Sequence, residues 1–274
     1  MKTILIAEIG ENHYGNWDLC RGMVREIAAG GASFAKFQTY TADQFGTDHP
    51  WHGEFRKVEM PEAVHFEMQA LCRDLGVGFL SSTFTVRSTA FLVDRMGLDA
   101  LKLASSRVPD ARLLDYVASR ADQVKTVYLS TGMATLDEVR AAVARLERIE
   151  RLYLLQCTSQ YPTDDENVNL RALATLREAF PGRGIGFSDH SRGLEACTAA
   201  VALGAEVLEK HFTYSVRLPG DDHAGALTPE SLPELVRRVE RIEAMLGSAE
   251  KAPVPAEGRA IAALRVEMRE VGYA

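Results

Sequence analysis

Short apolar runs alternate with longer amphipathic segments along almost the whole chain of 274 residues. Each apolar run has the length and composition of a buried strand, and each segment after it has the apolar spacing of a helix. Strict alternation of this kind indicates an α/β protein with a parallel sheet. The predicted strands are residues 3–8, 34–39, 77–80, 100–103, 124–129, 152–156, 185–187 and 207–208.

Helices are predicted between the strands, and two of them carry start signals. Thr135 and Glu138 have capping-box spacing, and Pro61 stands where it would open a helix in its first turn. The predicted helices are about 17–29, 61–75, 87–96, one from 109, 135–147, 169–179, 193–204 and 229–246. The segment 40–60 between the second strand and its helix is longer than usual, which suggests a lid or substrate loop.

Eight strand–helix units favour a closed (β/α)8 TIM barrel over an open doubly wound sheet. The open sheet usually has fewer units and a glycine-rich phosphate loop after its first strand. Residues 10–15 (Gly-Glu-Asn-His-Tyr-Gly) do not match that GxGxxG pattern. A single barrel of this kind also accommodates the length of the chain.

Composition restricts the class of function. The formal net charge of −7 argues against a nucleic-acid surface, and no apolar run is long enough to cross a membrane. The first strand resembles the start of a signal peptide, but Glu8 ends it too early. The four cysteines are scattered without a CxxC pair, which suits the reducing cytoplasm and argues against a cysteine metal site.

Two histidines stand at equivalent ends of the last two predicted strands, with one helical segment between them. Neighbouring parallel strands lie about 4.8 Å apart, which would bring His190 and His211 within reach of one metal ion. For either histidine alone, a hydrogen bond to a strand-end carbonyl is the simpler interpretation. The repeat at equivalent strand ends favours the shared metal, whose open positions would suit catalysis.

Polar side chains follow every predicted strand, at the end where a barrel carries its active site. They are Glu8, Lys36, Gln38, Ser81, Ser82, Lys102, Ser105, Ser130, Thr131, Gln156, Thr158, Ser159, Ser188, His190, Glu209 and His211. A barrel selected only for stability would not need polar groups at this end of each strand. The pattern therefore predicts a site at these strand ends.

Two lysines and a set of hydroxyls indicate an anionic substrate. Lys36 and Lys102 both follow apolar strand residues, so a solvated position is hard to assign to them, although a surface lysine is the simpler interpretation of either alone. Together with the hydroxyls they would hold phosphate or carboxylate oxygens. Glu209 lies two residues before His211, on the same side of the strand, and could ligate a metal, orient a ligand or act as a base.

Several short motifs at successive strand ends resemble the sialic acid synthase (N-acetylneuraminate synthase) family over about residues 3–247. Each motif is weak alone, and their order makes the resemblance specific. They are Ala-Glu-Ile-Gly-Glu-Asn-His at 7–13, Lys-Phe-Gln at 36–38, Lys-Leu-Ala-Ser at 102–105, Leu-Ser-Thr-Gly-Met at 129–133, Cys-Thr-Ser-Gln-Tyr-Pro at 157–162, Ser-Asp-His at 188–190, Glu-Lys-His-Phe at 209–212 and Pro-Gly-Asp-Asp-His at 219–223.

The resemblance implies condensation of phosphoenolpyruvate with an aldose such as N-acetylmannosamine. It implies a divalent metal, Mn²⁺ or Mg²⁺, on His190 and His211, and a cytoplasmic homodimer. It assigns phosphoenolpyruvate to Lys36, Lys102, Ser105, Ser130 and Ser188, and the sugar to Glu8, Gln38, Tyr161 and Asp222. We expect catalytic roles for Glu8, His190, His211 and Glu209, and further substrate contacts from Ser82 and Ser159.

The sequence departs from the family pattern in three places. The family's Ser-Thr-Pro-Phe is Ser-Ser-Thr-Phe at 81–84, and Ser159 stands where an asparagine is common. The family's antifreeze-like domain, which gives an arginine to a partner's sugar site, has no counterpart in 248–274. We expect residues 1–247 to form the barrel and 248–274 a linker and helical tail, with Ile261, Leu264 and Met268 on one stripe, either packed or solvated.

Two other interpretations stay open from the residues alone. One is a metal-dependent aldolase or hydrolase barrel that acts on another anionic substrate. The other is a barrel without catalytic activity that serves as a binding subunit. Phosphate release that needs both phosphoenolpyruvate and an aldose would separate the synthase from both.

Overall fold

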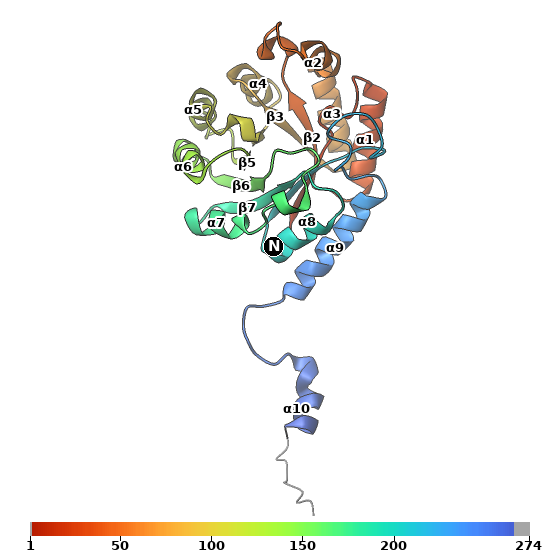
Figure 1. Ribbon diagram of the computed structural model, residues 1–274, viewed down its shortest axis with the longest axis vertical. Helices are drawn as coiled ribbons and strands as arrows, with labels where there is room; N and C mark the ends of the chain where they lie inside the picture. The colour runs from red at the N-terminus through yellow and green to blue at the C-terminus, as the bar shows by residue number, and fades with distance from the viewer. Residues whose placement is uncertain (1, 266–274) are drawn as a thin grey trace, which may run out of the picture.

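The computed structural model describes residues 2–265, in which eight parallel strands close into a barrel (Figure 1). Each strand pairs with the next along the chain, and β1 pairs with β8 to complete the circle. The strands are β1 (Ile4–Glu8), β2 (Phe34–Thr39), β3 (Gly78–Thr83), β4 (Ala100–Leu103), β5 (Thr126–Ser130), β6 (Arg151–Cys157), β7 (Gly184–Asp189) and β8 (Val207–His211).

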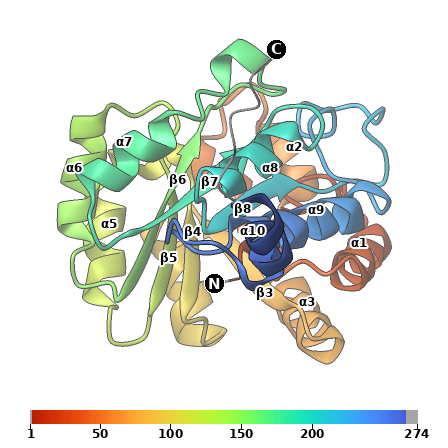
Figure 2. The same ribbon diagram turned by 90° about the horizontal axis from the view of Figure 1, so that it is seen from below.

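Helices surround the strands in both views of the molecule (Figures 1 and 2). This arrangement confirms the predicted (β/α)8 TIM barrel. The helices and helical turns are α1 (Trp17–Ala29), η1 (Ala42–Phe45), α2 (His52–Val58), α3 (Glu62–Leu75), α4 (Val86–Ala90), η2 (Phe91–Arg95), η3 (Ser105–Arg107), α5 (Ala111–Ser119), α6 (Leu136–Arg145), η4 (Asp165–Asn167), α7 (Ala172–Ala179), α8 (Glu195–Ala202), α9 (Ser231–Leu246), η5 (Pro255–Glu257) and α10 (Gly258–Leu264).

Alternation along each strand divides the apolar residues into two cores. One set faces the helices and forms the larger core. The other fills the barrel interior with bulky side chains, namely Ile6, Leu80, Tyr128, Leu155 and Val207. Because side chains two residues apart point the same way, the residues two positions further along these strands also face inward, and most of them are polar. The apolar layer inside the barrel therefore ends at the level where the candidate site begins.

Capping explains several helix boundaries. The Thr135 side chain accepts from the backbone N–H of Glu138, and Glu138 Oε2 accepts from the backbone N–H of Thr135, so the predicted capping box is confirmed. Pro61 instead precedes the first turn of α3 as its N-cap residue, with extended backbone angles. The prediction of Pro61 inside the first turn was therefore wrong by one position, a common uncertainty at helix ends.

Two predicted segments differ in detail from the structure. The connection 40–60 is folded into η1 and α2 rather than being an open loop. The predicted helix 87–96 consists of α4 followed by η2, a π-helical turn with a bond from Met96 N–H to the Phe91 carbonyl. This wider turn buries three consecutive apolar residues, Phe91, Leu92 and Val93, which a 3.6-residue period would separate.

The C-terminal segment contains the helical turn η5 and, directly after it, the short helix α10. In Figure 1, α10 lies beyond the end of α9, below the ring of helices. The sequence left open whether this helix is packed or solvated. Within the described residues the structure favours a solvated helix, because Leu264 is 78% exposed. Met268, the third residue of the predicted stripe, lies outside the described residues. Among residues 2–265, no helix is long and apolar enough to cross a membrane.

Candidate active site

A cavity of about 360 Å³ opens at the carboxyl ends of the strands. It is lined by all but one of the residues to which the sequence assigned a catalytic, substrate-binding or metal-binding role. These are Glu8, Lys36, Gln38, Ser82, Lys102, Ser105, Ser130, Ser159, Tyr161, Ser188, His190, Glu209 and His211. The exception is Asp222, which lies on the edge of the site with its Oδ1 3.6 Å from His211 Nε2.

Strand register explains why distant residues meet here. Glu8 stands opposite both Lys36 on β2 and His211 on β8. Ser82 likewise stands opposite Gln38 on one side and Lys102 on the other. Parallel pairing places these carboxyl-terminal positions side by side around one rim of the barrel.

Two lysines and two glutamates form a buried ionic cluster at the base of the cavity. Lys36 Nζ lies 2.6 Å from Glu8 Oε2 and 3.8 Å from Glu209 Oε2, and it donates to Ser82 Oγ at 2.9 Å. Lys102 Nζ lies 3.7 Å from Glu209 Oε1 and donates to the Leu103 carbonyl at 2.9 Å. Both lysines are at most 3% exposed, so neither amine faces bulk water.

The two amines have opposite pKa shifts. Burial lowers the pKa of Lys102, and the nearby charge of Lys36 adds to that effect. Burial also opposes the charge on Lys36, but Glu209 and Glu8 outweigh it and raise its pKa. Glu209 is buried too, yet Lys102 and Lys36 hold its pKa below the ordinary value. The cluster therefore keeps a carboxylate between two amines, with Lys102 the less strongly compensated of the two.

His190 and His211 face the same space, with ring centroids 5.6 Å apart. His190 Nδ1 donates to the Thr158 carbonyl at 2.9 Å, which leaves Nε2 as the acceptor nitrogen. His211 Nδ1 is buried without a hydrogen-bond partner among the described residues, and burial lowers the pKa of His211 to about 3. The two interpretations of a strand-end histidine, a hydrogen bond to a carbonyl and a metal ligand, are therefore compatible for His190. Its Nδ1 bonds the Thr158 carbonyl, and its Nε2 could still accept a ligand.

These imidazoles fit a metal ion only as a two-nitrogen site. In the part of the chain that the structure describes, no group of three or more His, Cys, Asp or Glu side chains is arranged to hold a metal. An unpartnered buried nitrogen costs about 1–3 kcal/mol, a cost that a bound cation would remove. The donor set suits a divalent ion whose remaining positions are filled by water or substrate oxygens.

Three hydroxyls, those of Ser105, Ser130 and Ser188, line the same cavity as Lys102. The backbone N–H of Gly132 donates to Ser105 Oγ at 3.0 Å. Ser130 Oγ is buried without a partner among the described residues, and Ser188 Oγ donates to Glu209 Oε1 at 3.1 Å. A buried hydroxyl that has no partner among the described residues, in a cavity that an amine also lines, can donate to an anion.

The histidine side of the cavity carries groups suited to a polyhydroxylated ligand. Tyr161 packs on His190 with ring centroids 4.0 Å apart, and Gln38 Nε2 donates to Glu8 Oε1 at 3.2 Å. Gly10, at φ +52°, passes so close that an added Cβ would lie 3.2 Å from Glu8 Oε1. Only glycine combines this backbone angle with this approach.

Contacts between distant segments hold the loop that carries Asp222. The Tyr14 hydroxyl donates to the Pro219 carbonyl at 2.6 Å and lies 2.7 Å from His223 Nε2. His223 Nδ1 lies 2.8 Å from Thr213 Oγ1. The loop is thus fastened on both sides of Asp222, which fixes the carboxylate near His211. Burial raises the pKa of Asp222.

Some site residues were missed and some strand-end residues face elsewhere. Cys157 lines the cavity, and its signal was available, because it continues the inward alternation of Leu155. Met133 and Phe84 also line it, from turns whose direction alternation does not set. Ser81, by contrast, bonds Thr39 Oγ1 at 2.6 Å on the outer face, and Gln156 lines a separate cavity there.

The fold and this lining define a parallel barrel with a buried cluster of lysines, glutamates and hydroxyls beside two histidines. Residues 23–251 match the sequence profile of the NeuB family. The chain belongs to the NeuB family.

Individual relatives agree with this assignment. The chain is 38% identical to an uncharacterized protein of Methanocaldococcus jannaschii, over 93% of this chain and 75% of that protein. It is 35% identical to the N,N'-diacetyllegionaminic acid synthase of Legionella pneumophila, over 92% and 76%. The crystal structure of N-acetylneuraminic acid (sialic acid) synthetase from Leptospira borgpetersenii, in complex with citrate, superposes with a TM-score of 0.90 at 31% identity, covering 97% and 94%.

Proposed function

We propose that this protein condenses phosphoenolpyruvate with an aldose to give a 2-keto-3-deoxy sugar acid and phosphate. The observation that carries the proposal is one cavity in which Lys102 and the hydroxyls lie beside two histidines. Relatives whose names describe them as sugar acid synthases support the same chemistry. The anion site would take one substrate and the histidine side the other.

The amines and hydroxyls would bind phosphoenolpyruvate. Lys102 and Ser130 each have capacity for an additional acceptor, because Ser130 Oγ has no partner among residues 2–265 and Lys102 donates to only one carbonyl there. Ser105, held by Gly132, would complete the set. Charge-assisted bonds of this kind are roughly twice as strong as neutral ones.

His190 and His211 would hold a divalent ion, Mn²⁺ or Mg²⁺, through nitrogens that have no hydrogen-bond partner among residues 2–265. Such an ion, when bound, supplies Lewis-acid polarisation of the acceptor's carbonyl. Tyr161, packed on His190, and Gln38, bonded to Glu8, would orient the hydroxyls of an open-chain sugar. Ser159 and Asp222 would contact the same ligand from opposite edges.

The reaction balances with one water molecule. The C3 carbon of phosphoenolpyruvate forms a bond to the aldehyde carbon, and the aldehyde oxygen takes a proton. Water adds to the cationic C2 and loses one proton, which balances the proton taken by the aldehyde oxygen. The C2–O bond to phosphate then breaks with its electron pair going to the phosphate, and the C2 hydroxyl gives its remaining proton to that phosphate to leave the ketone. Glu8 and Glu209, two buried carboxylates that line the cavity, would hold and move these protons.

Phosphate release tests this proposal. The assay supplies phosphoenolpyruvate, Mn²⁺ or Mg²⁺ and a panel of hexosamines, pentoses and their phosphates, and mass spectrometry identifies the product. We expect release only when both substrates are present. Phosphate from phosphoenolpyruvate alone would indicate a hydrolase, and a barrel that binds ligands without turnover would indicate a binding subunit. Calorimetric binding of Mn²⁺, lost in His211→Ala, tests the metal site independently of turnover.

A further inference from the structure

The turn after β1 is joined to the loop that carries Asp222 by a chain of hydrogen bonds. The Tyr14 hydroxyl has one proton and gives it to the Pro219 carbonyl at 2.6 Å, so it accepts from His223 Nε2 at 2.7 Å. His223 therefore carries its ring proton on Nε2, and its Nδ1 accepts from the Thr213 hydroxyl at 2.8 Å. Burial lowers the pKa of His223, which agrees with a neutral ring.

Tyr14 has a backbone conformation that a tyrosine rarely adopts. Its φ is +51°, in the left-handed region, where a bulky side chain is uncommon. Such a conformation persists only where the surroundings hold it, and it is often found at functional sites. The turn is held from α2 as well, because a Cβ at Gly15 would collide with the Lys57 carbonyl oxygen. The fold therefore keeps an unfavourable backbone conformation that brings the Tyr14 hydroxyl to Pro219.

Asp222 lies between the two points at which Tyr14 holds the loop. Pro219 precedes Asp222 in sequence and His223 follows it, and both are bonded to the same hydroxyl. Asp222 Oδ1 is 3.6 Å from His211 Nε2, at the edge of the active site. Loss of the Tyr14 hydroxyl would release both flanks of the carboxylate, whereas the pairing of the barrel strands does not involve Tyr14.

We propose that Tyr14 is a positioning residue for the acceptor, and that its hydroxyl holds Asp222 where the aldose binds. Tyr14 does not line the cavity, so it acts through the loop and not by touching the substrate. A displaced carboxylate binds sugar hydroxyls less well, because hydrogen bonds weaken steeply with poor geometry. Lys102 and Ser130 take no part in the chain, so phosphoenolpyruvate binding should not change. This inference rests on the proposed function, since it names which substrate the tyrosine serves.

The variant Tyr14→Phe tests the inference, because it removes the hydroxyl and keeps the ring that stacks on His223 with centroids 5.3 Å apart. We expect the KM for the aldose to rise by about 10-fold, the effect of leaving hydrogen-bonding groups unpaired. The KM for phosphoenolpyruvate should stay unchanged. An unchanged KM for the aldose, or an equal rise in both KM values, overturns the inference.

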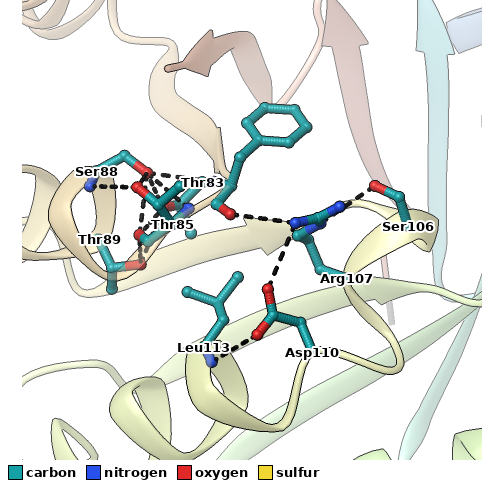
Figure 3. Close-up of polar contacts among 9 residues, drawn as sticks. Thr83, Thr85, Ser88, Thr89, Ser106, Arg107, Asp110 and Leu113 are labelled. Carbon is teal, nitrogen blue, oxygen red and sulfur yellow. Dashed lines mark hydrogen bonds and ion pairs between the residues drawn. The ribbon is translucent and has the colours of Figure 1, made fainter. Parts of the chain in front are cut away.

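Two control variants separate positioning from a general loss of stability. Tyr116→Phe removes a hydroxyl on α5 that accepts from Arg120 Nη2 at 2.9 Å. Thr85→Val removes the cap of α4, where Thr85 Oγ1 accepts from the backbone N–H of Ser88 at 3.1 Å, within a cluster of hydroxyls on another turn of the rim (Figure 3). We expect both controls to keep the KM for the aldose, although Thr85→Val should lower the melting temperature. A rise in that KM as large in Thr85→Val as in Tyr14→Phe overturns the inference.

Hydrogen exchange separates failure of this inference from failure of the proposed function. Residues 213–227 contain backbone bonds that report on the loop, such as the one from Ala226 N–H to the His223 carbonyl. We expect their amides to exchange about 10-fold faster in Tyr14→Phe than in the wild type, and at the wild-type rate in Tyr116→Phe. If no aldose supports turnover, the proposed function fails, and faster exchange still supports the role of the hydroxyl in holding the loop. Equal exchange in the wild type and Tyr14→Phe overturns the inference.

Discussion

Lys210 Nζ lies 2.6 Å from Asp189 Oδ2, and both side chains are about 1% exposed. The two residues are register partners on β8 and β7, and each directly precedes a histidine of the site. Lys210 also donates to the Ser191 carbonyl at 2.7 Å. This buried pair therefore joins the two strand ends that present His190 and His211.

Replacing Lys210 with methionine should destabilise the protein by about 3–5 kcal/mol, because it leaves the Asp189 carboxylate buried without its partner. Urea denaturation measures the change. The control Lys2→Met removes an exposed lysine that pairs with Glu240 at 3.4 Å and should change stability by less than about 1 kcal/mol. A loss in Lys210→Met as small as in the control would show that the pair is not important for stability.

The buried His13 should make stability depend on pH. Its Nδ1 accepts from the backbone N–H of Gly15 at 2.9 Å, and burial lowers its pKa from 6.5 to about 4. A lowered pKa in the folded state favours the neutral ring, so its contribution is complete above pH 6.5 and is lost as the pH falls. The loss approaches about 3 kcal/mol below pH 4.

The variant His13→Asn isolates this effect, because its amide oxygen can accept the same hydrogen bond without titrating. Denaturation of both proteins between pH 7 and 4 should show a steeper decline for the wild type. Parallel curves would mean that His13 is not held neutral in the folded protein.

Gly132→Ala should weaken phosphoenolpyruvate binding. An added Cβ would lie 2.6 Å from Ser159 Oγ and 2.9 Å from Ser105 Oγ, so both hydroxyls would have to move. We expect the KM for phosphoenolpyruvate to rise by about 10-fold, since a small displacement of binding groups is costly. The control Gly53→Ala meets no atom within 4 Å and should leave the KM unchanged. Equal KM values for phosphoenolpyruvate in Gly132→Ala and Gly53→Ala would contradict the conclusion that the hydroxyls beside Gly132 bind this substrate.

Lys102→Ala should act mainly through the KM for phosphoenolpyruvate, with an increase of about 10-fold to 100-fold, the range for a lost hydrogen bond to a charged group. Lys57→Ala, an exposed lysine paired with Glu54 at 2.7 Å, is the matched control. An unchanged KM in Lys102→Ala would remove this amine from the anion site.

Much of the barrel and its site could be predicted because both depend on local patterns. Lys36 and Gln38 are two residues apart on one strand, so alternation sends both inward once the barrel is assumed. The strand ends were predicted too early, at Leu80 where β3 ends at Thr83 and at Gln156 where β6 ends at Cys157. Residues at these ends were therefore not sorted by alternation, and Ser81 and Gln156 were wrongly grouped with the site.

Other features depend on contacts between distant segments. The position of Asp222 follows from Tyr14 reaching Pro219, 205 residues away in sequence. Phe84 and Met133 likewise line the active site from turns, which strand alternation does not position. Such placements follow from how loops close over the barrel, which sequence periodicity does not describe.

The rate of phosphate release in the presence of phosphoenolpyruvate, a divalent metal and an aldose tests the account most directly, measured for the wild type and for His190→Ala. We expect release by the wild type only when both substrates are present, and a rate lower by more than about 100-fold in the variant. Phosphate released from phosphoenolpyruvate without an aldose, or full activity in His190→Ala, would contradict the account.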